Sequence, residues 1–389
     1  MAVDYRIIAP VIKSALSGES SVLPDDFNIE ELIDLASEHQ ITNILYEGAV
    51  LCGVDISCDG MKRLFSRCCK NLMVSEEQLY EINTVCDLFE KNGIKHMPVK
   101  GTVLKSRYPK SDMREMSDAD ILIDPADYPK IKEIMTSLGY SEHMESDHDF
   151  TFKKGKTTME MHKYLVSASH KEMFEYFENV WERARLVDGT KNRYELLPTE
   201  NYIYIFMHLA KHYIDGGVGI KHITDMFILQ DDIYDKEYII SSLKKMKLDR
   251  FYGNISDMIS VWFYGKDANE ITDHISEYII NSGAYGTYEN HIISQTAGGI
   301  SEKNAKNGKM KRYMQLIFPS VANMKYAYPV LKKAPILLPF VWVYRWVAVL
   351  LGKRGNISNA KRSADVVSEE KISGYVQAMQ YVGLGDKIE

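Results

Sequence analysis

The chain lacks the features of several protein classes. It has only five cysteines in 389 residues, all between Cys52 and Cys86, and no two of them form a Cys-x-x-Cys pair. An odd number with this spacing argues against both a disulfide framework and a zinc knuckle. We therefore expect reduced, mostly packed thiols and a reducing cytoplasm as the compartment.

An excess of positive charge and a long apolar run are also absent. The net charge is −7, so we expect no extended nucleic-acid surface. The first twenty residues carry charges and no long apolar region, which predicts no signal peptide. Residues 336–351 are apolar apart from Arg345, but fall short of the ~20 residues of a spanning helix. We expect a buried or interface helix there rather than membrane-surface contact, and no transmembrane span.

The composition that is present, 45% hydrophobic and 26% charged, is that of a folded chain. Helical spacing of apolar residues predicts an N-terminal helical region over residues 1–74. Strand and helix patterns alternate over residues 75–197, and residues 198–389 return to a helical pattern. The predicted fold class is α+β, with a small mixed-sheet domain flanked by N- and C-terminal helical regions.

Local signals set the order of elements in the middle domain. The run S-E-E-Q from Ser75 is a capping-box pattern that predicts the start of a helix. A strand is predicted over 94–99, followed by a short helix that ends near Pro109. Residues 118–124 alternate polar and apolar side chains as a half-buried strand does. The segments HDFTF and TTMEMHKYL then form a hairpin with its turn at 153–156.

Two aspartates on one predicted strand carry the main chemical signal. Asp118 and Asp120 are two residues apart, so their side chains point to the same face. Two carboxylates this close repel each other unless a cation lies between them, and Mg²⁺ (or Mn²⁺) suits such oxygen ligands. Glu160 and His162 share one face of a later strand. If the two strands are neighbours, Glu160 completes a three-carboxylate site, as a metal ligand or as a general base.

Residues upstream of the aspartates suit a phosphate group. Lys100, Gly101 and Thr102 follow a predicted strand, and glycine there lets the backbone approach phosphate closely. The N-terminus of the next helix favours anions. Arg114 is expected to bind a phosphate oxygen, and Ser117 stands directly before the aspartate pair. We assign these five residues and His162 to nucleotide binding.

Two other polar groups receive structural interpretations. Asp147-His148-Asp149 is a second D-x-D triplet, but no apolar run follows it, so a solvated turn or strand edge is expected. His208 and His212 are four apart and share one helical face. A zinc protease would need glutamate where Leu209 stands. A packed or pocket-lining histidine pair, with Asp225 as a hydrogen-bond partner, is favoured.

Five segments carry a resemblance to a known family: VKGTVLKSRYP at 99–109, REMSDADILID at 114–124, MEMHKYL at 159–165, HLAKH at 208–212 and KHITDMFIL at 221–229. They resemble the nucleotidyltransferase superfamily that includes DNA polymerase beta, and more closely its bacterial family of uncharacterised nucleotidyltransferases. The resemblance implies metal-dependent transfer of a nucleoside monophosphate from a nucleoside triphosphate such as ATP, with release of pyrophosphate. It implies Asp118 and Asp120 as the metal pair and Glu160 as the third carboxylate.

The chain departs from the superfamily pattern at two points. Thr102 stands where serine or glycine is usual, and the connection from Gly101 to Asp118 is longer than in minimal members. The acceptor, a hydroxyl on a small molecule or a protein, and the preferred base are left open. Two alternatives also stay open: a non-catalytic nucleotide-binding or regulatory protein, and a D-x-D glycosyltransferase. The second is less favoured because such an enzyme needs a larger sheet domain before its D-x-D.

Overall fold

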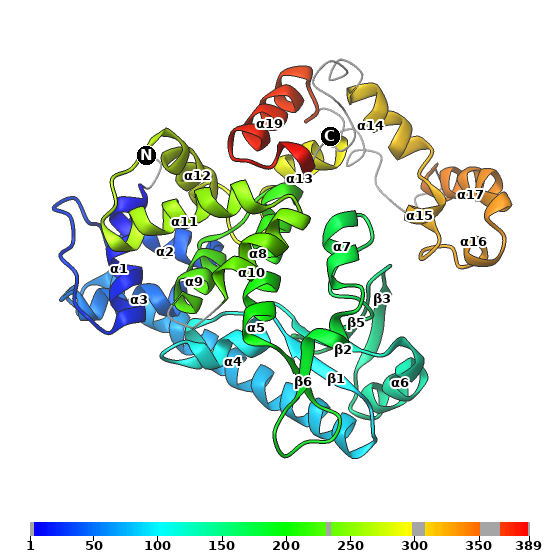
Figure 1. The fold of residues 1–389 in the computed structure, drawn as a ribbon, viewed down its shortest axis with the longest axis horizontal. Helices are drawn as coiled ribbons and strands as arrows, with labels where there is room; N and C mark the ends of the chain where they lie inside the picture. Colours follow the sequence, from blue (N-terminus) through cyan, green and yellow to red (C-terminus); the bar gives the residue numbers. More distant parts are fainter. Residues whose placement is uncertain (1–3, 231–234, 298–307, 351–365, 388–389) are drawn as a thin grey trace. The chain divides into compact units, whose positions relative to one another are not determined.

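The computed structural model describes residues 4–230, 235–297, 308–350 and 366–387 (Figure 1). The chain forms two compact units. The first contains residues 1–211 and 218–285, and the second contains residues 212–217 and 286–389.

A five-stranded mixed sheet organises the first unit (Figure 1). In spatial order its strands are β1 (His96–Val99), β2 (Ala119–Ile123), β5 (Thr157–His162), β4 (Asp149–Lys154) and β3 (Ser141–Glu145). β2 and β5 pair in parallel, whereas all other neighbours pair antiparallel. A separate two-stranded sheet pairs β6 (Ala184–Leu186) with β7 (Tyr194–Leu196). The predicted α+β class is therefore confirmed.

The helices of the first unit precede, interrupt and follow the sheet. They are α1 (Tyr5–Ser17), α2 (Ile29–Glu38), α3 (Thr42–Leu51), α4 (Asp59–Lys91), α5 (Gly101–Leu104), α6 (Tyr128–Ser137), α7 (Lys171–Phe177), α8 (Pro198–Asp215), α9 (Ile220–Leu229), α10 (Lys236–Lys245), α11 (Asp249–Tyr264) and α12 (Glu270–Ile280). The last turn of α8 extends past residue 211, where the first unit's opening stretch ends.

One face of the sheet is covered by α4 and α6. Val85 and Phe89 of α4 and Ile131 and Met135 of α6 are fully buried in one apolar cluster. The strand residues in this cluster from β2 and β5 are Ala119, Ile121, Ile123, Met159 and Met161. Because side chains alternate along a strand, the residues between them point to the opposite face of the sheet. That face carries the polar residues of β2 and β5.

Helix α4 corrects the predicted helix start at Ser75. It runs unbroken from Asp59 to Lys91 and begins at an N-cap, Cys58, well before the capping-box pattern. Ser75 is buried in the middle of this helix, where its hydroxyl accepts a hydrogen bond from Lys105 Nζ at 2.7 Å. The same serine that can cap a helix thus serves here as a buried partner for a lysine.

Local sequence patterns predict the hairpin of β4 and β5 but not the strand beside it, β3. β4 and β5 form the predicted hairpin, but the turn is only Gly155 and Lys156, because Lys153 and Lys154 continue β4 beyond the predicted start of the turn at residue 153. The edge strand β3 was not predicted. Four of its five residues are exposed, so it lacks the apolar alternation that reveals a half-buried strand.

Among the described residues of the second unit, all regular secondary structure is helical, in agreement with the predicted helical C-terminal region. Its helices are α13 (Tyr288–Ala297), α14 (Gly308–Ile317), α15 (Val321–Met324), α16 (Val330–Lys333), α17 (Leu338–Leu350) and α19 (Glu369–Tyr381).

Helix α17 contains most of the apolar stretch predicted at 336–351, whose last residue lies outside the described residues. Val341 packs in a small core, but Phe340 and Val343 are 72% and 65% exposed. The helix is therefore only half buried, and its role as an interface stays a prediction. Among the described residues, none of the helices combines the length and apolarity needed to cross a membrane.

Candidate functional site

Strand pairing brings the predicted carboxylates together. In the parallel pair of β2 and β5, Asp120 lies opposite Glu160. Met159 and Met161 point into the core, as predicted, so Glu160 and His162 lie with Asp120 on the other face. Ligand atoms of Asp120, Glu160 and His162 all lie within 4.8 Å of one another. The condition on which the three-carboxylate site depends, that the two strands are neighbours, is met.

Asp120 is the most constrained of these groups. Its side chain is almost fully buried, and its Oδ1 atom accepts hydrogen bonds from Lys100 Nζ and His162 Nε2, both at 2.6 Å. Burial works against its charge, but the ammonium of Lys100 and the bond from His162 hold the pKa of Asp120 well below its usual range. The charged form of Asp120 is thus favoured at the centre of the site.

Asp118 stands one residue before β2 and is half-buried. Burial raises its pKa to about 6, and repulsion from Asp120 and Glu160 adds to this effect. The ammonium groups of Lys100 and Lys221 oppose this shift. The three carboxylates that the sequence singled out therefore affect one another through their charges.

Lys100 has an unusual backbone conformation. With Gln40 and Lys247, it is one of three non-glycine residues with positive φ in the described part of the chain, at φ +53° and ψ −130°. Such a conformation costs on the order of 1–3 kcal/mol and occurs preferentially at functional sites. Here it turns the chain from β1 into α5, with the preceding Val99 paired opposite Asp120 in the sheet. The strained turn thus delivers the ammonium to the carboxylate.

The two residues after Lys100 differ in what surrounds them. A Cβ atom at Gly101 would lie 2.7 Å from the sulfur of Met116, so glycine is needed for close packing in this structure. Thr102 has a buried hydroxyl with no hydrogen-bond partner among the described residues. The predicted contacts of both residues with phosphate stay predictions.

Arg114 and Ser117 have protein partners. Arg114 is buried, and its Nε and Nη2 atoms donate to the two oxygens of Asp225 on α9, at 2.6 and 2.8 Å. These two bonds occupy the Nε and Nη2 atoms of the guanidinium, the group that the sequence predicts to bind a phosphate oxygen. Ser117 Oγ accepts hydrogen bonds from Gln40 and from Tyr285. Both residues hold the segment before β2 against neighbouring elements.

Two residues near the carboxylates were not predicted from the sequence. Lys221 on α9 is buried, and burial with the nearby charge of Arg114 lowers its pKa to about 7, whereas the charge of Asp118 opposes that shift. Tyr204 on α8 is fully buried, and its pKa is raised by burial, while the charge of Lys100 opposes this. Both residues lie in segments with helical spacing, which indicates burial but not the neighbour that each meets.

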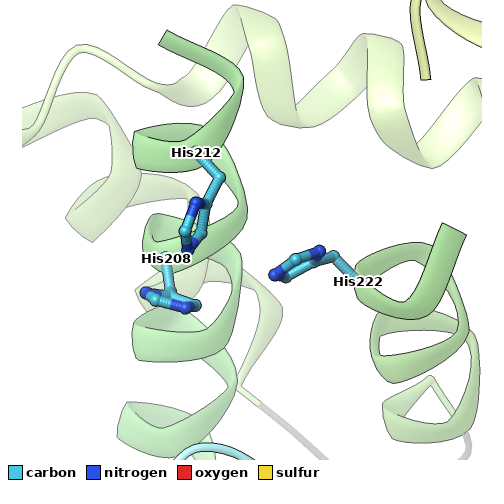
Figure 2. Close-up of side chains that lie close together, drawn as sticks. All are labelled: His208, His212 and His222. Carbon is cyan, nitrogen blue, oxygen red and sulfur yellow. The ribbon is translucent and has the colours of Figure 1, made fainter. Parts of the chain in front are cut away.

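The predicted histidine pair on α8 has a third member. His208 and His212 follow each other by one turn of the helix, and His222 on α9 is turned toward them (Figure 2). One nitrogen of each ring lies within 4.8 Å of the others. The Asp225 carboxylate, expected to bond these histidines, is instead bonded by Arg114 and Tyr108.

A small mixed sheet that places carboxylates on two adjacent parallel strands, with helices behind it, is consistent with a nucleotidyltransferase domain. Residues 25–264 match the model of the family described as uncharacterised nucleotidyltransferase, and because this match covers more than half of the chain, the chain belongs to that family. The resemblance drawn from the sequence is confirmed, and the family indicates nucleotidyl transfer in general. No curated protein and no solved structure matches the chain.

Proposed function

We propose that the protein transfers a nucleoside monophosphate from a nucleoside triphosphate to an acceptor hydroxyl on a small molecule or a protein, releasing pyrophosphate. The observation that carries this proposal is the register of β2 and β5, which sets Asp120 opposite Glu160, with Asp118 close enough to be affected by both charges. Membership of the nucleotidyltransferase family supports the reaction class.

The charge of the site fits a divalent cation. Burial and two neighbouring carboxylates raise the pKa of Asp118, and a bound cation would relieve this repulsion. We assign Asp118, Asp120 and Glu160 as its ligands, and oxygen donors of this kind suit Mg²⁺ or Mn²⁺. When bound, such a metal neutralises the charge that develops on the phosphate oxygens during in-line displacement.

Residues of the chain supply the remaining functions. Glu160 has an alternative role, in which it does not bind the cation but accepts the proton of the attacking hydroxyl. Although burial opposes it, the hydrogen bond from His162 lowers the pKa of Glu160, which keeps this carboxylate ionised as a base must be. Lys100 and the hydroxyl of Thr102 are the donors that we assign to the phosphates. Arg114, bonded to Asp225, is a positioning residue for the segment that leads to Asp118.

Label transfer tests this proposal directly. The full chain is incubated with each α-labelled nucleoside triphosphate, with Mg²⁺ or Mn²⁺ and with a cell extract, and labelled acceptor and released pyrophosphate are both measured. We expect transfer by the wild type and its loss in Asp118→Asn and Asp120→Asn. Asp124→Asn is the matched control, because Asp124 is exposed at the other end of β2 and should leave transfer unchanged.

Three outcomes contradict the proposal. Nucleotide binding without pyrophosphate release across many extracts would indicate a binding or regulatory protein. Product formed only from nucleotide sugars would indicate a glycosyltransferase. Equal loss of transfer in Asp124→Asn and Asp120→Asn, with all variants folded, would show that the carboxylate site has no special role.

A further inference from the structure

The triplet Asp147-His148-Asp149 is not the solvated turn or edge that its sequence suggests. It leads into β4, whose first residue, Asp149, pairs with His162 of β5 across the sheet. Asp149 is 5% exposed and His148 is partly buried; only Asp147 is exposed. His148 and Asp149 therefore lie beside His162, the histidine that bonds Asp120.

These side chains have the spacing of metal ligands. His148 Nε2 lies 3.3 Å from Asp149 Oδ2, and one ligand atom each of His148, Asp149 and His162 all lie within 4.8 Å of one another. Ligands ~2.0–2.1 Å from a tetrahedral zinc ion are themselves about 3.3 Å apart. The distance of 3.3 Å between His148 Nε2 and Asp149 Oδ2 already matches this ligand–ligand distance.

His162 has one ring nitrogen to spare for this group. Its Nε2 atom contacts Asp120 and, at 3.4 Å, Glu160. The His162 side chain is buried, with the residue 1% exposed, yet its Nδ1 atom has no hydrogen-bond partner among the described residues. A buried polar atom without a partner is costly, and a metal ion is one way to satisfy a bare imidazole nitrogen.

Each histidine also has the outer partner that metal-bound histidines usually have. The second nitrogen of His148, Nδ1, lies 2.8 Å from Asp147 Oδ1, and the second nitrogen of His162 lies 2.6 Å from Asp120. Carboxylates in this position fix the ring and make the ligand nitrogen more basic. Ser146 Oγ, in turn, donates to Asp149 Oδ2 at 2.9 Å.

We propose that His148 Nε2, Asp149 Oδ2 and His162 Nδ1 bind a transition-metal ion such as Zn²⁺, at a site separate from the three carboxylates. Two imidazole ligands favour zinc over magnesium, and three protein ligands leave a fourth position open. The nearby positive charge of Lys211 opposes a cation, whereas Asp149 and the outer carboxylates favour it. The site does not depend on nucleotidyl transfer, and it joins the catalytic face only through His162.

Zinc binding by the full chain, after removal of metal with a chelator, tests this site by equilibrium dialysis and metal analysis. All variants are made in a chain that also carries His212→Ala, because this substitution removes one ligand of the three-histidine cluster of Figure 2, which could otherwise compete for zinc. In that background we expect His148→Ala and Asp149→Asn to lose one bound Zn²⁺ per chain. The exposed His143 on β3 supplies the control, and His143→Ala should keep it.

Two further readouts make the result decisive. Asp147→Asn removes only an outer partner, so it should keep the stoichiometry and weaken zinc binding by about 10- to 100-fold. Co²⁺ bound to the His212→Ala protein should show the intense visible absorption of a four-coordinate site, even with Mg²⁺ in excess. The proposal is overturned if this spectrum is absent, or if folded Asp149→Asn binds zinc like the His143→Ala control.

Discussion

Replacing Asp225 with alanine is expected to destabilise the protein by about 3–5 kcal/mol. Asp225 is 1% exposed and accepts two hydrogen bonds from Arg114 and one, at 2.6 Å, from Tyr108. The alanine variant leaves the guanidinium of Arg114 buried without its counter-ion, next to the charge of Lys221. Breaking a buried ion pair from one side is costly for this reason. Urea unfolding of both proteins gives the difference in free energy of unfolding.

Asp257 provides a matched control for this measurement. It pairs with Lys266 at 2.7 Å, but both side chains are about half exposed. Loss of a surface pair costs about 0–1 kcal/mol, so Asp257→Ala should change little. The double variant Arg114→Met/Asp225→Ala should recover part of the loss, because no buried charge is left unpaired. A loss for Asp225→Ala no greater than for Asp257→Ala would contradict the assigned role of the pair.

The carboxylate site could be predicted to a large extent because it depends on strand periodicity. Alternation alone separates Glu160 from Met159 and Met161, and an apolar face must meet a core. The same rule places Asp118 and Asp120 on one side of their strand. Periodicity does not say which strands pair, so the adjacency of β2 and β5 was only a condition of the sequence argument; the structure shows it in the register of Asp120 with Glu160.

Sequence patterns miss contacts whose partner lies far along the chain. The phosphate contact of Arg114 stays a prediction, but its bond to Asp225, 111 residues away, was not predicted because no local pattern links the two. Ser75 looked like a helix start, yet buried positions such as Leu64 and Cys68 continue the helix before it. The burial of Asp149 depends on its pairing with β5, which a short polar triplet does not reveal.

Protonation of the buried His39 is expected to lower the stability of the protein in mild acid. His39 is fully buried between the end of α2 and the start of α9, and burial lowers its pKa to about 4, although a hydrogen bond to Ile280 O opposes this. Its Nδ1 atom accepts the backbone N–H of Ile220 at 3.1 Å, so Nε2 carries the proton and donates to Ile280 O at 3.0 Å. A second proton on Nδ1 would face the N–H of Ile220, donor against donor.

The direction of the effect follows from the two pKa values of His39. The unfolded chain takes up a proton near pH 6.5, whereas the folded protein resists protonation until about pH 4. The stability that the neutral ring contributes is therefore complete above pH 6.5 and is lost as the pH falls toward 4, by roughly 3 kcal/mol in total. Urea unfolding between pH 7.5 and 4.5 measures this loss.

A comparison of two histidine variants separates His39 from the other acid-sensitive groups. His39→Gln keeps one donor and one acceptor and does not titrate, so its stability should fall less steeply than that of the wild type below pH 6.5. His143→Gln replaces an exposed ring and should keep the wild-type slope. If both variants follow the wild-type curve, His39 is not the group that couples folding to pH. Because Ile220 directly precedes Lys221, acid opening at His39 should also loosen the helix end that carries this lysine to Asp118.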